Sequence, residues 1–166
     1  MTHNILVSDP ISEEGLQSLI HHPDFKVDFK SGLTEEELVD IIPNYQGLIV
    51  RSQTQVTESI INHASNLKVI ARAGVGVDNI DIKSATLNGI LVVNAPDGNT
   101  ISATEHSVAM ILAMARNIPQ AYTSLKNKEW NRKAFKGVEL YQKVLGVIGA
   151  GRIGLGVAER LKSFGM

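Results

Sequence analysis

Five short apolar runs that alternate with helical segments constrain the fold of this chain more than any other feature. The runs are four to six residues long, and the connections between them are short. Such alternation is typical of a parallel sheet that is covered by helices on both faces. Right-handed crossovers then favour a flavodoxin-like, doubly wound α/β layout. The predicted strands cover residues 4–9, 25–29, 47–50, 68–73 and 90–94.

Helical patterns connect the predicted strands, over residues 12–21, 34–42, 57–63 and 81–88. Ser12 stands where the N-cap of the first helix is expected. Thr34 and Glu37 have the spacing of a capping box, in which each side chain accepts a hydrogen bond from the other residue's backbone N–H. The sequence therefore carries local signals for where its helices begin.

Ligands of open parallel sheets bind outside the carboxyl ends of the strands. In this chain those ends carry Asp9, Arg51, the loop 72–79 and the residues after Asn94. The loop reads Arg72-Ala-Gly-Val-Gly-Val-Asp-Asn79, so a cation is followed by two glycines whose backbone N–H groups are open to a ligand. Such a concavity suits a carboxylate or a phosphate.

Arg51 ends the neighbouring strand and is followed by Ser52 and Thr54. Together with Arg72 it puts two strand-end cations on one rim, which predicts a site for a small molecule with several negative charges. The alternative is that both arginines are solvated or salt-bridged at the sheet edge. The residues alone leave both interpretations open.

The alternation of apolar runs and helical segments ends at residue 94. The turn-rich stretch that follows predicts a boundary between domains 1–97 and 98–166. A helix is expected over residues 101–116, and it is apolar on most of its circumference. Such a helix is buried on all sides, between domains or in a subunit interface. A second helix is expected over 119–128, followed by an exposed basic loop that carries Trp130.

The histidines do not form a recognisable reactive site. Glu105 and His106 are adjacent, so they do not share a helix face, and Glu105 is instead expected to close a capping box with Ser102. The five histidines lack the spacing of metal ligands, and structural roles are expected for them. The sequence therefore predicts neither a catalytic residue nor a metal site in this chain.

A glycine fingerprint, Gly149-x-Gly151-x-x-Gly154, follows an apolar run at 144–148 and opens a helix expected over 152–164. The first glycine allows a sharp strand-to-helix turn, and the second lets a pyrophosphate approach the backbone. Gly154 is expected to let the helix pack closely on the strand. The phosphates of a dinucleotide would then lie at the helix N-terminus. The alternative is an ordinary turn between a strand and a helix.

Composition narrows the class of ligand. Sixteen basic and seventeen acidic residues leave no basic surface for nucleic acid. No apolar run approaches the roughly 20 residues of a membrane span. The chain contains no cysteine, which excludes disulfides and thiolate chemistry and fits a cytoplasmic protein. A small anionic molecule is the expected partner, rather than nucleic acid or a membrane.

Taken together, five motifs resemble the D-isomer-specific 2-hydroxyacid dehydrogenases, and the resemblance covers nearly the whole chain. It implies a flavodoxin-like substrate domain followed by the first part of a Rossmann NAD-binding domain. It is closest to the branch that uses NAD to oxidise 3-phosphoglycerate to 3-phosphohydroxypyruvate in serine biosynthesis. The motifs are residues 50–52 (VRS), 67–81 (LKVIARAGVGVDNID), 94–106 (NAPDGNTISATEH), 116–119 (RNIP) and 145–154 (LGVIGAGRIG).

The resemblance also implies roles for single residues. The phosphate end of the substrate would lie against three side chains, those of Arg51, Ser52 and Arg72. Backbone N–H groups of Val75 and Gly76 would hold its carboxylate beside the nicotinamide of NAD, with Asn99 nearby. The pyrophosphate of NAD would be held by Gly149, Gly151, Arg152, Ile153 and Gly154.

The family's catalytic residues are expected beyond residue 166, so the chain alone is expected to be inactive and to bind NAD weakly. The strand 144–148 and the helix face of Val157, Leu161 and Phe164 are expected to lack partners within the chain. Residues from about 140 onward should therefore pair with a second copy or leave their Rossmann position. A homodimer is expected through the apolar helix and the Trp130 loop, with Arg132 either reaching a neighbour's substrate site or facing solvent.

The residues allow three other interpretations. A phosphorelay receiver needs an acidic cluster after its first strand and an aspartate after its third, but this chain has only Asp9 and Arg51 there. A non-catalytic, NAD-sensing scaffold of the same fold is the second. The third is a glyoxylate/hydroxypyruvate or other D-2-hydroxyacid reductase. The second cation, Arg72, favours a phosphorylated substrate over this last group.

Overall fold

The computed structural model describes residues 2–166 and divides between Gly98 and Asn99 into two compact units. The first unit is a parallel α/β sheet, and the second is built from helices and extended chain. The assignment of the two units to substrate and nucleotide binding stays a prediction.

The first unit contains a five-stranded, fully parallel sheet in the order β2-β1-β3-β4-β5. This is the strand order of flavodoxin-like sheets, so the predicted fold class is confirmed. Val50 pairs with Arg72, which brings the carboxyl ends of β3 and β4 level with each other. The strands are β1 (His3–Val7), β2 (Phe25–Phe29), β3 (Gly47–Val50), β4 (Val69–Arg72) and β5 (Leu91–Asn94).

Short helices form the crossovers between these strands. The Thr34–Glu37 capping box is confirmed: Glu37 N donates to Thr34 Oγ1 at 3.2 Å, and Thr34 N donates to Glu37 Oε2 at 2.8 Å. Ser12 is the N-cap residue of the first helical segment, as predicted, but its side chain accepts no capping hydrogen bond, and Gly15 N donates to the Ser12 carbonyl at 3.1 Å. The helical segments are η1 (Glu13–Leu16), α1 (Gln17–Ile20), α2 (Glu35–Ile41), η2 (Ile42–Asn44), α3 (Glu58–His63) and α4 (Ile82–Leu87).

The sheet has a larger core on one face than on the other, because alternate residues of a strand point to opposite faces. On the larger side, Leu48 and Ile70 are fully buried beneath α2, α3 and α4. On the other side Ile49 packs with residues of β1, η1 and α1. Leu91 of β5 is 62% exposed, so this second face is covered mainly at β1 and β2.

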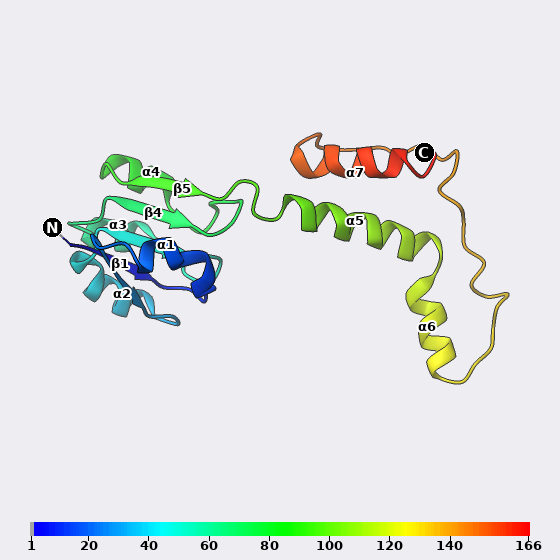
Figure 1. The fold of residues 1–166 in the computed structure, drawn as a ribbon, viewed down its shortest axis with the longest axis horizontal. Helices are drawn as coiled ribbons and strands as arrows, with labels where there is room; N and C mark the ends of the chain where they lie inside the picture. The colour runs from blue at the N-terminus through cyan, green and yellow to red at the C-terminus, as the bar shows by residue number, and fades with distance from the viewer. Residues whose placement is uncertain (1) are drawn as a thin grey trace. The chain divides into compact units, whose positions relative to one another are not determined.

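The second unit contains α5 (Thr100–Ala115), α6 (Ile118–Lys126) and α7 (Arg152–Lys162). Helices α5 and α7 pack side by side (Figure 1). Leu161 is fully buried there, and a Cβ on Gly156 would lie 2.9 Å from Thr104 Oγ1. The prediction that Leu161 lacks a partner within the chain is therefore wrong, since α5 covers this face of α7. Phe164 stays 43% exposed.

The strand predicted at 144–148 is wrong. The segment is extended but belongs to no sheet, and Val144 and Ile148 are almost completely exposed. A strand needs a hydrogen-bonded neighbour, and none of residues 2–166 pairs with this segment. Pairing with a second copy of the chain stays a prediction.

Helix α5 is not buried on all sides as its composition suggested, because α7 covers only part of its surface. Thr104 and Val108 are buried, whereas Met110 and Met114 are 56% and 72% exposed. A location at a domain or subunit interface stays a prediction. The predicted Ser102–Glu105 capping box is also wrong: α5 begins one residue after Asn99, so Ser102 lies inside its first turn and donates to the Asn99 carbonyl instead.

The loop after α6 agrees with the sequence. Trp130 is 76% exposed, and residues 131–133 are exposed as well. This loop therefore presents two cations, Arg132 and Lys133, beside a large aromatic side chain.

Candidate functional site

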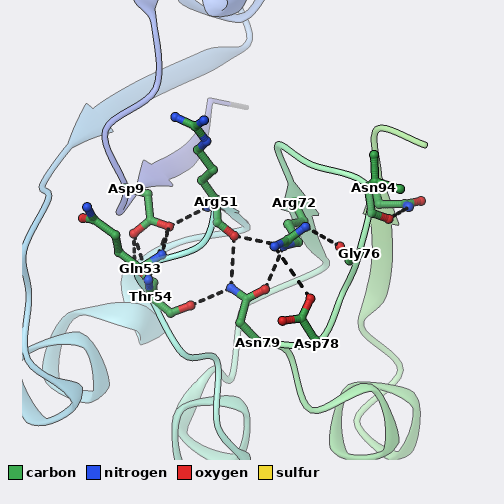
Figure 2. Close-up of polar contacts among 10 residues, drawn as sticks. Asp9, Arg51, Gln53, Thr54, Arg72, Gly76, Asp78, Asn79 and Asn94 are labelled. Atoms are coloured by element: carbon green, nitrogen blue, oxygen red, sulfur yellow. Dashed lines mark hydrogen bonds and ion pairs between the residues drawn. The ribbon is translucent and has the colours of Figure 1, made fainter. Parts of the chain in front are cut away.

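The candidate site lies where β1, β3 and β4 reach their carboxyl ends. Asp9 follows β1, Arg51 follows β3, and Arg72 is the last residue of β4. The parallel register brings these three positions to one edge of the sheet, where the polar side chains form a connected network (Figure 2). Open α/β sheets bind their ligands at this edge.

Asp9 organises the turn that follows β3. Asp9 is only 3% exposed. Its carboxylate accepts hydrogen bonds from three backbone N–H groups: Arg51 N at 2.6 Å, Gln53 N at 3.1 Å and Thr54 N at 3.0 Å. The Thr54 hydroxyl donates to the same carboxylate at 2.5 Å. A buried carboxylate is stable only when donors surround it, and here the backbone of one turn supplies most of them.

Arg51 presents its side chain away from this network. Its backbone N–H and carbonyl are both bonded, but within residues 2–166 its guanidinium makes no hydrogen bond or ion pair. Figure 2 shows the side chain extending away from Asp9 and Asn79. Ser52 beside it is exposed. The turn therefore holds a cation whose backbone is fixed and whose charge is available.

Arg72 is different, because its guanidinium is bonded inside the protein. Nε donates to Asn79 Oδ1 at 2.8 Å and to the Arg51 carbonyl at 3.0 Å, and Nη1 donates to the Gly76 carbonyl at 2.8 Å. Nη2 lies 3.7 Å from Asp78 Oδ1, and the Arg72 side chain is only 13% exposed. Arg72 thus has the salt-bridged arrangement that the sequence left open as the alternative. Its contact with a substrate stays a prediction.

Two glycines of the loop after β4 make room for the ion pair, Gly74 for the Arg72 guanidinium and Gly76 for the Asp78 carboxylate. A Cβ on Gly74 would lie 2.7 Å from Arg72 Nη1, and one on Gly76 would lie 2.8 Å from Asp78 Oδ1. Among the residues described, nothing accepts a hydrogen bond from the backbone N–H groups of Val75 and Gly76. The loop therefore wraps around an internal cation and still offers two adjacent donors.

Asn79 is a central residue that the sequence analysis missed. It is 6% exposed, and its Nδ2 donates to the carbonyls of Arg51 at 3.1 Å and Thr54 at 2.7 Å. Because its Oδ1 accepts from Arg72, one amide joins the turn after β3 to the loop after β4. Asn94 was also missed, and its Nδ2 donates to the Val75 carbonyl at 2.6 Å. Both asparagines lie within motifs that carry the family resemblance, at 67–81 and 94–106, but their hydrogen-bond partners cannot be read from the sequence.

The remaining predicted residues lie in the second unit. Asn99 is the N-cap residue of α5, and Gly151 is the N-cap residue of α7. Gly149 has φ +93°, a left-handed conformation that glycine adopts without strain and that gives the predicted sharp turn.

A Cβ on Gly154 would collide with the Gly149 carbonyl oxygen. Gly154 therefore lets the loop fold back on α7, whereas close packing of the helix on a strand was expected. Arg152 and Ile153 form the first turn of α7 beside these glycines. Their contact with a pyrophosphate stays a prediction.

Within residues 2–166, no three His, Asp or Glu side chains gather closely enough to hold a metal ion. None of the helices in that part of the chain has the length and apolar character needed to cross a membrane.

Residues 5–151 match the protein family described as D-isomer specific 2-hydroxyacid dehydrogenase, catalytic domain. The chain belongs to this family. Its similarity to curated members is high over 162 residues: it is 55% identical to the D-3-phosphoglycerate dehydrogenase of Methanocaldococcus jannaschii and 52% identical to that of Synechocystis. Each alignment covers 98% of this chain but only 30% and 29% of the two relatives.

The chain is also similar in structure to part of a solved dehydrogenase. The NAD⁺-bound 3-phosphoglycerate dehydrogenase of Entamoeba histolytica superposes with a TM-score of 0.79 at 29% identity. The superposition covers all of this chain and 52% of that one. The chain thus spans about a third of the curated dehydrogenases and half of the solved structure.

Proposed function

We propose that the whole protein is an NAD-dependent D-3-phosphoglycerate dehydrogenase, which oxidises the 2-hydroxyl of 3-phosphoglycerate to the ketone of 3-phosphohydroxypyruvate as the first step of serine biosynthesis. The curated relatives that bear this name support the reaction. One observation carries the proposal for this chain: within residues 2–166 the Arg51 guanidinium and the backbone N–H groups of Val75 and Gly76 have no partner, and they lie at the ends of neighbouring strands. A substrate with an anion at each end needs such a pair of binding points.

In this proposal the carboxylate of the substrate binds the backbone N–H groups of Val75 and Gly76. The phosphate binds Arg51, with the hydroxyl of Ser52 as a further donor. Arg72 adds positive charge beneath the loop while its guanidinium holds the loop closed. Neutral N–H donors and a cation together suit a doubly anionic molecule, because charge-assisted hydrogen bonds are stronger than neutral ones.

We assign the second unit to the nucleotide. The pyrophosphate of NAD binds at the N-terminus of α7, against Gly149, Gly151, Arg152, Ile153 and Gly154. The collision that a Cβ on Gly154 would cause supports this assignment, because a loop that turns this tightly leaves helix N–H groups open to an anion. NAD, when bound, accepts the hydride that leaves the substrate's C2.

We further propose a cytoplasmic homodimer that forms through α5 and the Trp130 loop. Met110, Met114 and Trp130 are all more than half exposed, and the burial of large exposed apolar side chains favours association. In such a dimer Arg132 reaches the neighbour's substrate site or faces solvent. Measuring the molar mass in solution at micromolar concentration tests the dimer, and a monomer would contradict it.

A second substrate class has one observation in its favour. Because Arg72 is bonded within the protein, only Arg51 of the two predicted arginines has a guanidinium without a partner among the residues described. A small unphosphorylated 2-hydroxyacid, such as the product of a glyoxylate/hydroxypyruvate or other D-2-hydroxyacid reductase, needs only the two N–H groups. The substrate profile of the whole protein separates the two classes.

Arg51→Ala in the whole protein tests the proposal. Loss of one charged hydrogen-bonding partner should lower kcat/KM for 3-phosphoglycerate by about 2–4 kcal/mol, roughly 30- to 1000-fold. Turnover of an unphosphorylated 2-hydroxyacid and the affinity for NAD should change little. Lys68→Ala is the matched control, since this exposed cation precedes β4 and lies at the other end of the sheet. Equal losses for both substrates would remove Arg51 from the phosphate site.

A further inference from the structure

The turn of residues 51–54 is held from two sides by buried polar side chains. Asp9 takes the backbone N–H groups of Arg51, Gln53 and Thr54, while Asn79 donates to the carbonyls of Arg51 and Thr54. These two side chains come from different parts of the chain, and both residues are at least 94% buried.

The contacts of this network are all internal. Both oxygens of the Asp9 carboxylate are occupied by backbone or hydroxyl donors, and Thr54 Oγ1 also lies 3.0 Å from Ser8 Oγ. Asn79 uses both its amide nitrogen and its amide oxygen within the protein. A group that is saturated in this way cannot also bind a substrate, so its effect must pass through the residues that it holds.

The residue that the network holds most completely is Arg51. Its N–H is fixed by Asp9 and its carbonyl by both Asn79 and Arg72, yet its guanidinium is unbonded within residues 2–166 and extends outward (Figure 2). A long flexible side chain loses less entropy on binding when its backbone already points it in the required direction. Fixing the backbone of a free cation is therefore a means of preparing it for an anion.

We propose that Asp9, Thr54 and Asn79 are positioning residues that aim Arg51 at the phosphate of the substrate. The inference rests on the proposed function and adds these residues to it. None of the three touches the substrate. Removal of the Thr54 hydroxyl takes away one hydrogen bond to the Asp9 carboxylate and makes the turn less rigid. The substrate's phosphate should then bind less tightly, while the site for its carboxylate at Val75 and Gly76 remains intact.

Thr54→Val in the whole protein is the main test, because it removes one hydroxyl at nearly constant shape. The KM for 3-phosphoglycerate should rise about tenfold, as expected for one charge-assisted hydrogen bond, with less than about twofold change for an unphosphorylated 2-hydroxyacid. Asp9→Asn should act in the same direction. Thr54→Ser restores the hydroxyl and should restore the KM.

Thr57→Val is the matched control. Thr57 is the N-cap of α3, where its hydroxyl accepts from Ile60 N and donates to Glu35, so its loss lowers stability without touching the turn. It should lower the melting temperature and leave the ratio of the two KM values unchanged. A ratio that moves equally in Thr57→Val, or that does not move in Thr54→Val and Asp9→Asn, overturns the positioning role.

A second readout does not depend on turnover. Inorganic phosphate is titrated into the 166-residue chain, and the Arg51 side-chain resonance is followed by NMR. Binding should be about tenfold weaker in Thr54→Val than in the wild type and normal in Thr54→Ser. Equal binding by Thr54→Val, or no response of Arg51 in the wild type, overturns the proposal. Absence of 3-phosphoglycerate oxidation by the whole protein, with a normal phosphate response, instead overturns the proposed function alone.

Discussion

Similar apolar runs have different structures in the two units: one is a paired strand, and the other pairs with no strand among residues 2–166. In the first, β3 forms from four apolar or small residues that lie between β1 and β4, and every one of them is buried. In the second, the run Val144-Leu-Gly-Val-Ile148 is just as apolar but stays single and largely exposed. The helices α5, α6 and α7 nevertheless form there. A helix satisfies its own backbone hydrogen bonds, whereas a strand depends on a neighbour that its own sequence does not supply.

Amide hydrogen exchange should show this contrast most strongly. Residues 48–50 lie in a central strand, while within residues 2–166 no amide of 144–148 donates a backbone hydrogen bond. For a domain with a stability of about 5 kcal/mol, exchange in β3 should be at least about a thousandfold slower than at 144–148. The measurement is mass spectrometry or NMR on the chain. Comparable protection in the two segments would show that 144–148 pairs in solution, and the comparison would fail.

Substitutions to alanine should lower the free energy of unfolding far more in the sheet than in the segment 144–148. Ile70 is fully buried in β4, so Ile70→Ala should lower the free energy of unfolding by about 2–5 kcal/mol through lost contacts and a cavity. Val144 is 93% exposed, and Val144→Ala should stay within about 0.5 kcal/mol. Urea denaturation followed by circular dichroism measures both. A loss for Val144→Ala that approaches the loss for Ile70→Ala would mean that the segment is packed in solution.

The glycine loop gives the smallest expected effect. In Gly154→Ala the added Cβ meets the Gly149 carbonyl, and such overpacking should cost about 1–3 kcal/mol. Without that collision, alanine in α7 should instead stabilise the helix by about 0.5–1 kcal/mol. The sign of the change in the free energy of unfolding therefore shows whether the Gly149 carbonyl lies against Gly154 in solution. Gly146→Ala is the control, because a Cβ there meets nothing within 4 Å. The free energy of unfolding of each variant is the measurement.

Much of the first unit could be predicted because its signals are local. The alternation at 25–29 and the apolar run at 47–50 locate β2 and β3 at their observed bounds, and the Thr34–Glu37 spacing locates the start of α2. The predicted strand at 144–148 failed because the same kind of local signal says nothing about whether a neighbouring strand is present.

The candidate site was predictable in its positions but not in its contacts. Strand ends indicate Arg51 and the loop after Arg72, because parallel strands bring their carboxyl ends together. The bonds of Asp9 to Thr54 join residues 45 positions apart, and sequence spacing does not reveal them. The internal bonding of Arg72 likewise depends on where the Asn79 amide lies in three dimensions. Polar networks of this kind are properties of the folded chain.

The exposed tryptophan has a practical consequence for optical measurements. Trp130 is the only tryptophan of the chain and lies 76% exposed, outside the sheet unit. Its indole already has water around it in the native protein, so its emission should be at long wavelength before any denaturant is added. Unfolding of the sheet then changes the colour of that emission very little. The folded and unfolded chains should therefore have nearly the same tryptophan emission wavelength. A tryptophan placed in the core of β3 or β4 would report the unfolding of the sheet.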